Sequence, residues 1–162
     1  LKKLSKLFNV SIDYILGETD NKNREASLPD NAITDMKWLP VLGTIPAGKP
    51  VLAQENIEGY HPIPVSQIND NDEYFWLKVN GSSMKDAGIN DGDLVLIRQQ
   101  ENVENGEIGV VMVNSHDATL KRVYKSDGQL VLQPANDNYD PIFVQNEKAR
   151  IIGKKIGHYA ID

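Results

Sequence analysis

The chain has 162 residues, of which 40% are apolar and 25% charged, and its formal net charge at pH 7 is -6; this length and apolar content suffice for one domain with a buried core and additional segments. It contains no cysteine, which excludes a disulfide framework, a thiol nucleophile and a thiolate metal site. No apolar run reaches the ~18 residues needed to cross a bilayer and no signal peptide is recognisable, so we expect a cytoplasmic protein without a membrane anchor.

The first predicted elements are two short helices within residues 1–17. Ser11 and Gly17 are typical of the start and end of the second helix. The pattern L-x-x-L-S-x-x-F-x-V-S-x-x-Y-I-L-G in this segment resembles the C-terminal tail of a lambda-repressor-like helix-turn-helix domain. Because no methionine starts the chain, we expect a fragment that binds operator DNA through a largely missing domain, with its base-reading residues upstream of Leu1. A generic docking helix is the alternative.

Residues 18–37 are polar, poor in aromatics and interrupted by turn-forming residues, which predicts a flexible linker. Residues 1–37 contain six basic and six acidic side chains, whereas residues 38–162 contain eleven basic and seventeen acidic ones. Most of the affinity for DNA phosphates comes from lysine and arginine. The larger segment is therefore not expected to bind DNA non-specifically, and any DNA partner must be held elsewhere.

Residues 38–162 form a second domain of short apolar runs separated by turn signals such as Asn-Gly and Asp-Gly. No long helical period competes with these runs. We therefore predict a mostly-β domain, built as a strongly bent, barrel-like antiparallel assembly. The runs are 41–42, 51–52, 75–79, 94–97, 108–113, 119–124, 130–132, 142–144 and 151–156.

One segment of this domain, residues 79–93, is rich in small and polar residues. It follows the run 75–79, in which apolar and polar residues alternate as in a half-buried strand. We therefore expect Ser83 to lie just after the end of a strand. Gly81 allows a sharp turn there, so that consecutive N–H groups can point at one spot.

A serine needs an adjacent base to act as a nucleophile at neutral pH, and Lys121 is a candidate. In the predicted strand 119–124, alternation places Lys121 on the same face as Thr119 and Val123. A lysine that faces a sheet interior loses hydration, which disfavours its charged form and lowers its pKa. Without this context, a lysine in a strand is more often a surface residue.

Together, these segments resemble the self-cleaving repressors of the LexA and phage CI type. The spacing agrees with this resemblance, because the lysine lies 38 positions after the serine. An Ala-Gly bond in a loop expected to be extended lies upstream, as does the bond that these repressors cut. The motifs that carry the resemblance are residues 43–50, 81–86, 88–93 and 120–122.

The resemblance implies a Ser/Lys dyad of Ser83 and Lys121 that cuts the bond between Ala47 and Gly48. The backbone N–H groups of Ser82 and Ser83 would hold the oxyanion. Ser82 is the alternative nucleophile, but the family frame Gly-x-Ser-Met selects Ser83. At Ser82 the chain departs from the family, in which the commoner residue is larger.

The function implied by the resemblance is transcriptional repression of an SOS-type or prophage regulon. A RecA filament would activate cleavage, and residues 38–162 would form a homodimer; no cofactor is implied. Two rivals remain: a dimerisation module with the same fold that does not cut itself, and a self-trimming accessory subunit of an error-prone polymerase. The helix-turn-helix tail favours a repressor.

For the remaining candidate residues we expect structural roles. An acidic cluster, Asp86, Asp91 and Asp93, lacks the ligand pattern of a calcium loop and is expected to cap turns. The three histidines have no metal-ligand spacing, so we predict no metal site. Residues 151–157 are predicted to form a core strand, with an edge strand that pairs across a dimer as the alternative.

Overall fold

The computed structural model describes residues 35–161. The predicted helix-turn-helix tail at 1–17 and most of the predicted linker at 18–37 lie outside the described residues. The first strand begins at Met36, two residues before the expected start of the larger domain at Trp38. The described part of the chain has no helix long and apolar enough to span a membrane.

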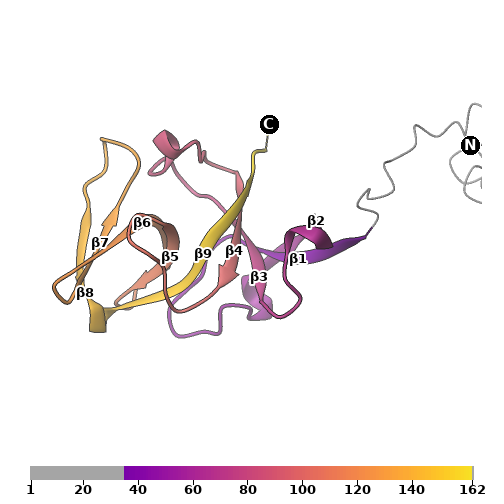
Figure 1. Cartoon of the computed structure of the whole chain (residues 1–162), viewed down its shortest axis with the longest axis horizontal. Coiled ribbons are helices and arrows are strands. Elements are labelled where there is room, and N and C mark those ends of the chain that lie inside the picture. Colours follow the sequence, from indigo (N-terminus) through magenta and orange to yellow (C-terminus); the bar gives the residue numbers. More distant parts are fainter. Residues whose placement is uncertain (1–34, 162) are drawn as a thin grey trace, which may run out of the picture. The chain divides into compact units, whose positions relative to one another are not determined.

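The described residues form one sheet of nine strands, and their other regular elements are short 3-10 helices (Figure 1). The mostly-β prediction is therefore confirmed. The strands are β1 (Met36–Leu42), β2 (Ile57–Pro64), β3 (Tyr74–Lys78), β4 (Leu94–Gln99), β5 (Ile108–Val113), β6 (Thr119–Ser126), β7 (Gln129–Gln133), β8 (Ile142–Gln145) and β9 (Ala149–Tyr159). The 3-10 helices are η1 (Gln54–Asn56), η2 (Val65–Gln67), η3 (Lys85–Ala87) and η4 (Asn146–Lys148).

The strand order is β2-β1-β3-β4-β9-β5-β6-β7-β8, so the edges are β2 and β8. Neighbours pair antiparallel except for β1 and β3, which are parallel. The register shifts within β1, β4 and β5 mark bulges, which bend a sheet. The strand β9 crosses the middle of the sheet between β4 and β5 (Figure 1), and residues 153–154 pair with strands on both sides, as expected of a core strand. Residues 155–157 pair with β4 alone, so this part of β9 has a free edge within the described residues.

The core occupies both faces of β3, and this corrects the prediction of a half-buried strand there. Phe75 and Leu77 belong to the main apolar cluster, which includes residues of β1, β4, β5, β6 and β9. Tyr74 and Trp76 on the opposite face pack in a second cluster with residues of β1, β2 and β4. The large aromatic side chains on the second face explain why alternation alone did not reveal its burial.

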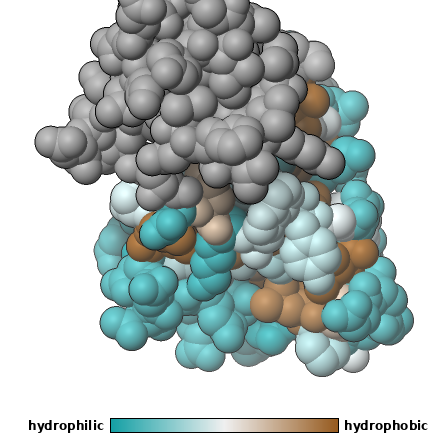
Figure 2. All heavy atoms as spheres, turned by 90° about the vertical axis from the view of Figure 1, so that its right-hand side faces the viewer, coloured by the Kyte–Doolittle hydropathy of each residue, from teal (hydrophilic) through white to brown (hydrophobic). Residues whose placement is uncertain are grey.

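Two local predictions are wrong. The apolar pair Val51 and Leu52 lies in a turn, and a strand that was not predicted, β2, follows. The sequence of β2 contains Gly59, Pro62 and Pro64, which break its apolar pattern. Proline also cannot donate a ladder hydrogen bond. An edge strand tolerates such residues because one side of it is unpaired. Figure 2, turned so that the right-hand side of Figure 1 faces the viewer, shows apolar and polar residues next to one another in the part of the surface that is coloured.

Candidate functional site

The serine-bearing loop between β3 and β4 is closed at its base by backbone hydrogen bonds. The N–H of Val79 donates to the carbonyl of Asp93, and the N–H of Gly92 donates back to Val79, both at 2.8 Å. Gly81 has a φ of 86°, a conformation that glycine adopts without strain. Its N–H donates to the Asp91 carboxylate at 2.7 Å. These contacts hold the loop in one conformation.

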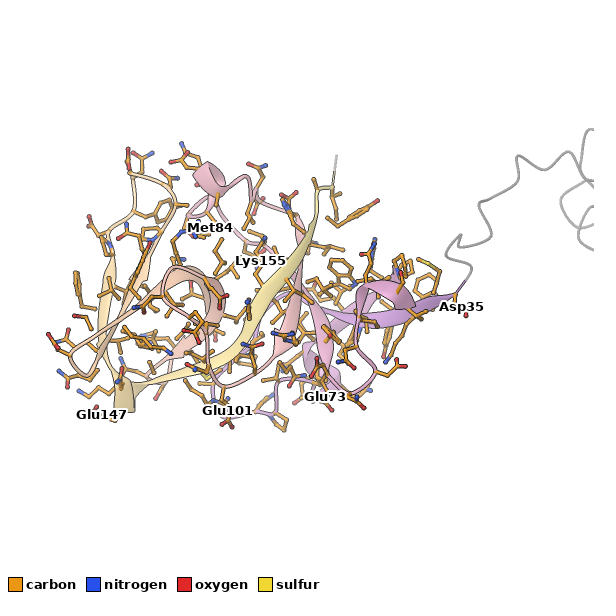
Figure 3. The ribbon with its side chains drawn as sticks, in the orientation of Figure 1. Asp35, Glu73, Met84, Glu101, Glu147 and Lys155 are labelled. Carbon is orange, nitrogen blue, oxygen red and sulfur yellow. The ribbon has the colours of Figure 1, made fainter. Side chains whose placement is uncertain are left out.

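Ser83 and Lys121, chosen from the sequence as candidates, lie together. The Nζ atom of Lys121 in β6 is 2.9 Å from Ser83 Oγ. Ser82, the alternative, faces elsewhere, and its hydroxyl lies 3.2 Å from the hydroxyl of Tyr139. Met84, which follows the serine and is labelled in Figure 3, is 1% exposed and belongs to the main apolar cluster. The buried methionine anchors the loop immediately next to the serine.

Lys121 is buried, with only 8% of its surface exposed. Its Nζ also lies 2.8 Å from Thr119 Oγ1 and 3.0 Å from the Leu120 carbonyl oxygen. Burial lowers the pKa of Lys121 below its ordinary value. Among residues 35–161, no carboxylate lies within salt-bridge distance of this amine to oppose that effect.

The three oxygen neighbours of Lys121 Nζ can satisfy the amine in both protonation states, because the charged form donates to all three. A neutral amine has two N–H donors and one lone pair. It can donate to the Leu120 carbonyl and to the Thr119 hydroxyl while it accepts the O–H of Ser83. The arrangement therefore suits an amine that takes the serine proton. Thr119 also belongs to this site. The sequence analysis placed it on the same strand face as Lys121 but gave it no role.

A cavity of about 120 Å³ opens beside these two residues. Its other lining residues are mainly apolar and come from the end of β3, the serine loop and the start of β6: Gly43, Leu77, Lys78, Val79, Asn80, Met84, Ala118, Thr119 and Leu120. The cavity has room for one small side chain. A larger hollow of about 700 Å³ contains neither Ser83 nor Lys121.

The backbone around the serine is fixed by hydrogen bonds that the carbonyl groups of Ser82 and Ser83 accept from another loop. The buried side chain of Asn136 donates to the Ser82 carbonyl at 2.8 Å, and the N–H of Ala135 donates to the Ser83 carbonyl at 2.8 Å. Within the described part of the chain, the N–H groups of Ser82 and Ser83 make no hydrogen bond. The sequence did not reveal Asn136, because it lies in a segment of turn-forming residues that carried no sign of burial.

The Ala47–Gly48 bond lies in a turn, which corrects the expectation of an extended loop. Gly48 is exposed with a φ of 81°, and this conformation ends the extended backbone that the flanking prolines favour. Upstream, Ile45 is buried, and its carbonyl accepts the N–H of Ala118 at 3.0 Å. No hydrogen bond among residues 35–161 joins Ala47 or Gly48 to the serine or the lysine.

One member of the acidic cluster, Asp93, caps a turn as predicted, whereas Asp91 bridges the two ends of the serine loop. Besides the contact of Asp91 with the serine loop, the Asp93 carboxylate accepts the N–H of Asn90 and contacts His158 Nε2, both at 2.8 Å. The Asn90 amide and the His158 ring lower the pKa of Asp93. Its second oxygen accepts the N–H of Ile161 at 3.2 Å. Asp93 thus ties the end of the serine loop to the end of the chain.

The class of the protein follows from comparison with known families. Residues 40–156 match the model of the Peptidase S24-like family. This match begins within β1 and ends within β9, and it includes the strands between them and the loop that carries Ser83. The chain therefore belongs to the Peptidase S24-like family.

Within this class the chain is similar to LexA repressors, which confirms the resemblance seen in the motifs. It is 47% identical to the LexA repressor of Clostridium kluyveri over 125 residues, which are 77% of this chain and 60% of that repressor. The LexA repressor of Clostridium novyi is 40% identical over 157 residues, which are 97% of this chain and 74% of that repressor. The LexA repressor of Geobacillus sp. is 43% identical over 131 residues, or 81% of this chain and 62% of that repressor. The chain thus spans about three fifths of the length of the Clostridium kluyveri and Geobacillus relatives.

Proposed function

We propose that this chain is part of a transcriptional repressor of an SOS-type or prophage regulon that is inactivated by cutting its own Ala47–Gly48 bond. Ser83 is the nucleophile and Lys121 the general base. The observation that carries the proposal is the distance of 2.9 Å between Lys121 Nζ and Ser83 Oγ, at a lysine that is almost fully buried. Membership of the Peptidase S24-like family supports the same chemistry.

The reaction begins when the Ser83 hydroxyl loses its proton to Lys121 and Oγ bonds to the carbonyl carbon of Ala47. The free N–H groups of Ser82 and Ser83 donate to the oxyanion that forms. Lys121 then returns the proton to the Gly48 nitrogen, and the carbon–nitrogen bond breaks. A water molecule then gives a proton to the neutral lysine and its oxygen bonds to the Ala47 carbonyl carbon. The bond to Ser83 Oγ breaks, Oγ takes the proton back from Lys121, and the carboxylic acid of Ala47 releases its own proton to solvent.

The position of the loop controls the reaction. The carbonyl carbon of Ala47 must come within about 3–3.5 Å of Ser83 Oγ to react, and this requires the turn at Gly48 to dock in the cavity. Because both groups belong to one chain, the effective concentration is high whenever the loop docks. An agent that favours the docked state therefore speeds cleavage in proportion. By resemblance to LexA-type repressors, that agent is a RecA filament.

The assembly that we propose is a homodimer formed by residues 38–162. The second half of β9 pairs with β4 on one side, whereas its pairing with β5 ends at Lys154, so one edge is free within the described residues. Ile156 and Tyr159 on this half are exposed. The free edge and these apolar side chains support pairing with a second copy. Operator DNA is then bound by a helix-turn-helix domain on the N-terminal side, and cleavage separates it from the dimer.

Mass spectrometry of the purified chain after incubation at several pH values tests this function. We expect fragments of residues 1–47 and 48–162, with a rate that rises about tenfold per pH unit below the pKa of Lys121, because the neutral fraction rises in that proportion. Ser83→Ala and Lys121→Ala should abolish the reaction. Lys125→Ala, a change of an exposed lysine on the same strand, is the matched control and should cut at the wild-type rate.

The same experiment separates the two serines. Ser82→Ala keeps its backbone N–H and should still be cut, whereas loss of cleavage in this variant with retention in Ser83→Ala would reverse the assignment. An intact wild-type chain at every pH, also with a RecA filament added, would refute self-cleavage. The dimerisation module without peptidase activity would then be the better account.

A further inference from the structure

The loop between β7 and β8, residues 134–141, holds the backbone of the nucleophile through a buried asparagine. Asn136 is 5% exposed, and its Nδ2 donates to the Ser82 carbonyl at 2.8 Å. One residue earlier, the N–H of Ala135 donates to the Ser83 carbonyl at 2.8 Å. In return, the Ala135 carbonyl accepts the N–H of Asp86 at 2.8 Å. The two peptide groups that follow Ser82 and Ser83 are therefore both fixed from the same loop.

The bond to the Ser82 carbonyl also sets the direction of the Ser83 N–H. In a trans peptide the C=O and N–H bonds of one planar group point in opposite directions. A donor that holds the Ser82 carbonyl on one side therefore aims the Ser83 N–H to the other side. This N–H makes no hydrogen bond within the described part of the chain, and it is one of the two proposed oxyanion donors.

The orientation of the Asn136 side chain is fixed by its second contact. Its Oδ1 accepts the N–H of Asn138 at 3.0 Å. A flipped amide would set its NH₂ against that N–H and its oxygen against the Ser82 carbonyl, so only one orientation satisfies both neighbours. The Ser82 carbonyl also accepts the N–H of Lys85 at 3.2 Å, but that donor belongs to the serine loop and moves with it. Asn136 is the tie to the rest of the fold.

We propose that Asn136 is a positioning residue for the self-cleavage reaction: by holding the Ser82 carbonyl, it aims the Ser83 N–H at the oxyanion and keeps Ser83 Oγ beside Lys121. This inference rests on the proposed function. A 1 Å misplacement at a reacting centre can cost roughly 10²-fold in rate. The contact between the hydroxyls of Ser82 and Tyr139 at 3.2 Å is a further, exposed contact between the same two loops.

The test compares Asn136→Ala with Asn138→Ala. Both changes remove an amide side chain from the same loop without adding a charge. Only the first removes the donor to Ser82, because the Asn138 side chain is exposed and contributes only its backbone N–H. First-order cleavage rates are measured against pH below the melting temperature of each variant. Asn136→Leu, which keeps the side-chain size and also lacks the donor, replaces Asn136→Ala if the latter does not fold.

We expect the Asn136 variant to cut roughly 10²-fold more slowly than the Asn138 variant on the alkaline plateau. The pH of half-maximal rate should be the same for both, because the charge of Lys121 is not what changes. A merely structural role would lower the melting temperature without lowering the plateau rate of the folded chain. NMR spectra can be recorded on chains that also carry Lys121→Ala, because these chains are expected to stay uncut. In these spectra, the backbone amide resonance of Ser83 should shift in the Asn136 variant and stay in place in the Asn138 variant.

Two failures are distinguishable. A wild-type chain that does not cut overturns the proposed function, and with it the catalytic role of Asn136. If the wild-type chain cuts itself and the plateau cleavage rate of the Asn136 variant is within about threefold of that of the Asn138 variant, the proposed function stands and the positioning role is refuted.

Discussion

Replacement of Thr119 by valine tests whether the amine of Lys121 is the group that titrates during cleavage. The Thr119 hydroxyl lies 2.8 Å from Lys121 Nζ and can only accept from the charged amine. Valine keeps the shape of threonine and removes this acceptor. A hydrogen bond from a charged donor contributes about 1.5–3 kcal/mol, and one from a neutral donor about 0.5–1.5 kcal/mol. The change therefore disfavours the charged amine by about 1 kcal/mol more than the neutral amine.

A difference of about 1 kcal/mol corresponds to a roughly fivefold higher ratio of neutral to charged lysine. We therefore expect the pH of half-maximal rate to fall in Thr119→Val. On the acidic limb of the pH profile, the rate divided by the alkaline plateau rate should rise roughly fivefold. This ratio does not depend on the plateau rate itself. The plateau rate should also fall, because the neutral amine loses the Thr119 hydroxyl and keeps only the Leu120 carbonyl as a hydrogen-bond acceptor that holds it in place.

The assay is the first-order appearance of the fragment 48–162, measured by mass spectrometry at closely spaced pH values. Thr119→Ser is the control, since it keeps the hydroxyl, and its profile should overlay that of the wild-type chain. If the profile of Thr119→Val does not move, or moves to higher pH, then Lys121 is not the titrating base or Thr119 does not contact its charged form.

Two further predictions concern stability. The pKa of Asp93 is lowered in the fold by the Asn90 amide and the His158 ring, so its ionised form stabilises the fold at neutral pH, and this contribution is lost as pH falls through the lowered pKa. In urea unfolding, Asp93→Asn should therefore reduce stability at pH 7, and its difference from the wild-type chain should shrink toward acid pH; a difference that does not change with pH would contradict this. Gly153→Ala should cost about 1–3 kcal/mol, because its Cβ would lie 2.4 Å from a backbone carbonyl oxygen of β4. Gly59→Ala, with no atom within 4 Å of the added carbon, is the matched control, and equal stability of the two variants would refute the clash.

The sequence predicts the strands of this fold better than their arrangement. Short apolar runs between turn signals marked β3 to β9, because strands buried on one or both faces need apolar side chains. β2 was missed, because Pro62 and Pro64 are residues that only an edge position tolerates. The parallel pairing of β1 with β3 was also missed. That pairing joins segments separated by the whole of β2, and no local pattern records which distant strand is the neighbour.

The site divides in a similar way. Ser83 and Lys121 could be chosen because a strand end, a glycine turn and strand alternation are local features. Asn136 could not be chosen, because its importance comes from burial against another loop, and a segment of proline, asparagine and aspartate has the composition of an exposed turn. The Gly48 turn was missed because the flanking prolines favour extended backbone, whereas glycine alone permits the positive φ observed there.

The surroundings of Lys121 explain how an acidic domain can contain a lysine whose pKa is lowered. Residues 38–162 carry seventeen acidic side chains, and a carboxylate beside the amine would raise its pKa and keep it charged. The residues that line the cavity next to Lys121 include Leu77, Val79 and Met84 but no aspartate or glutamate. In the proposed reaction, this cavity of about 120 Å³ receives a residue as small as Ala47. Burial without a carboxylate neighbour lowers the pKa of Lys121, and the small volume of the same cavity favours a small residue at the bond that we propose is cut.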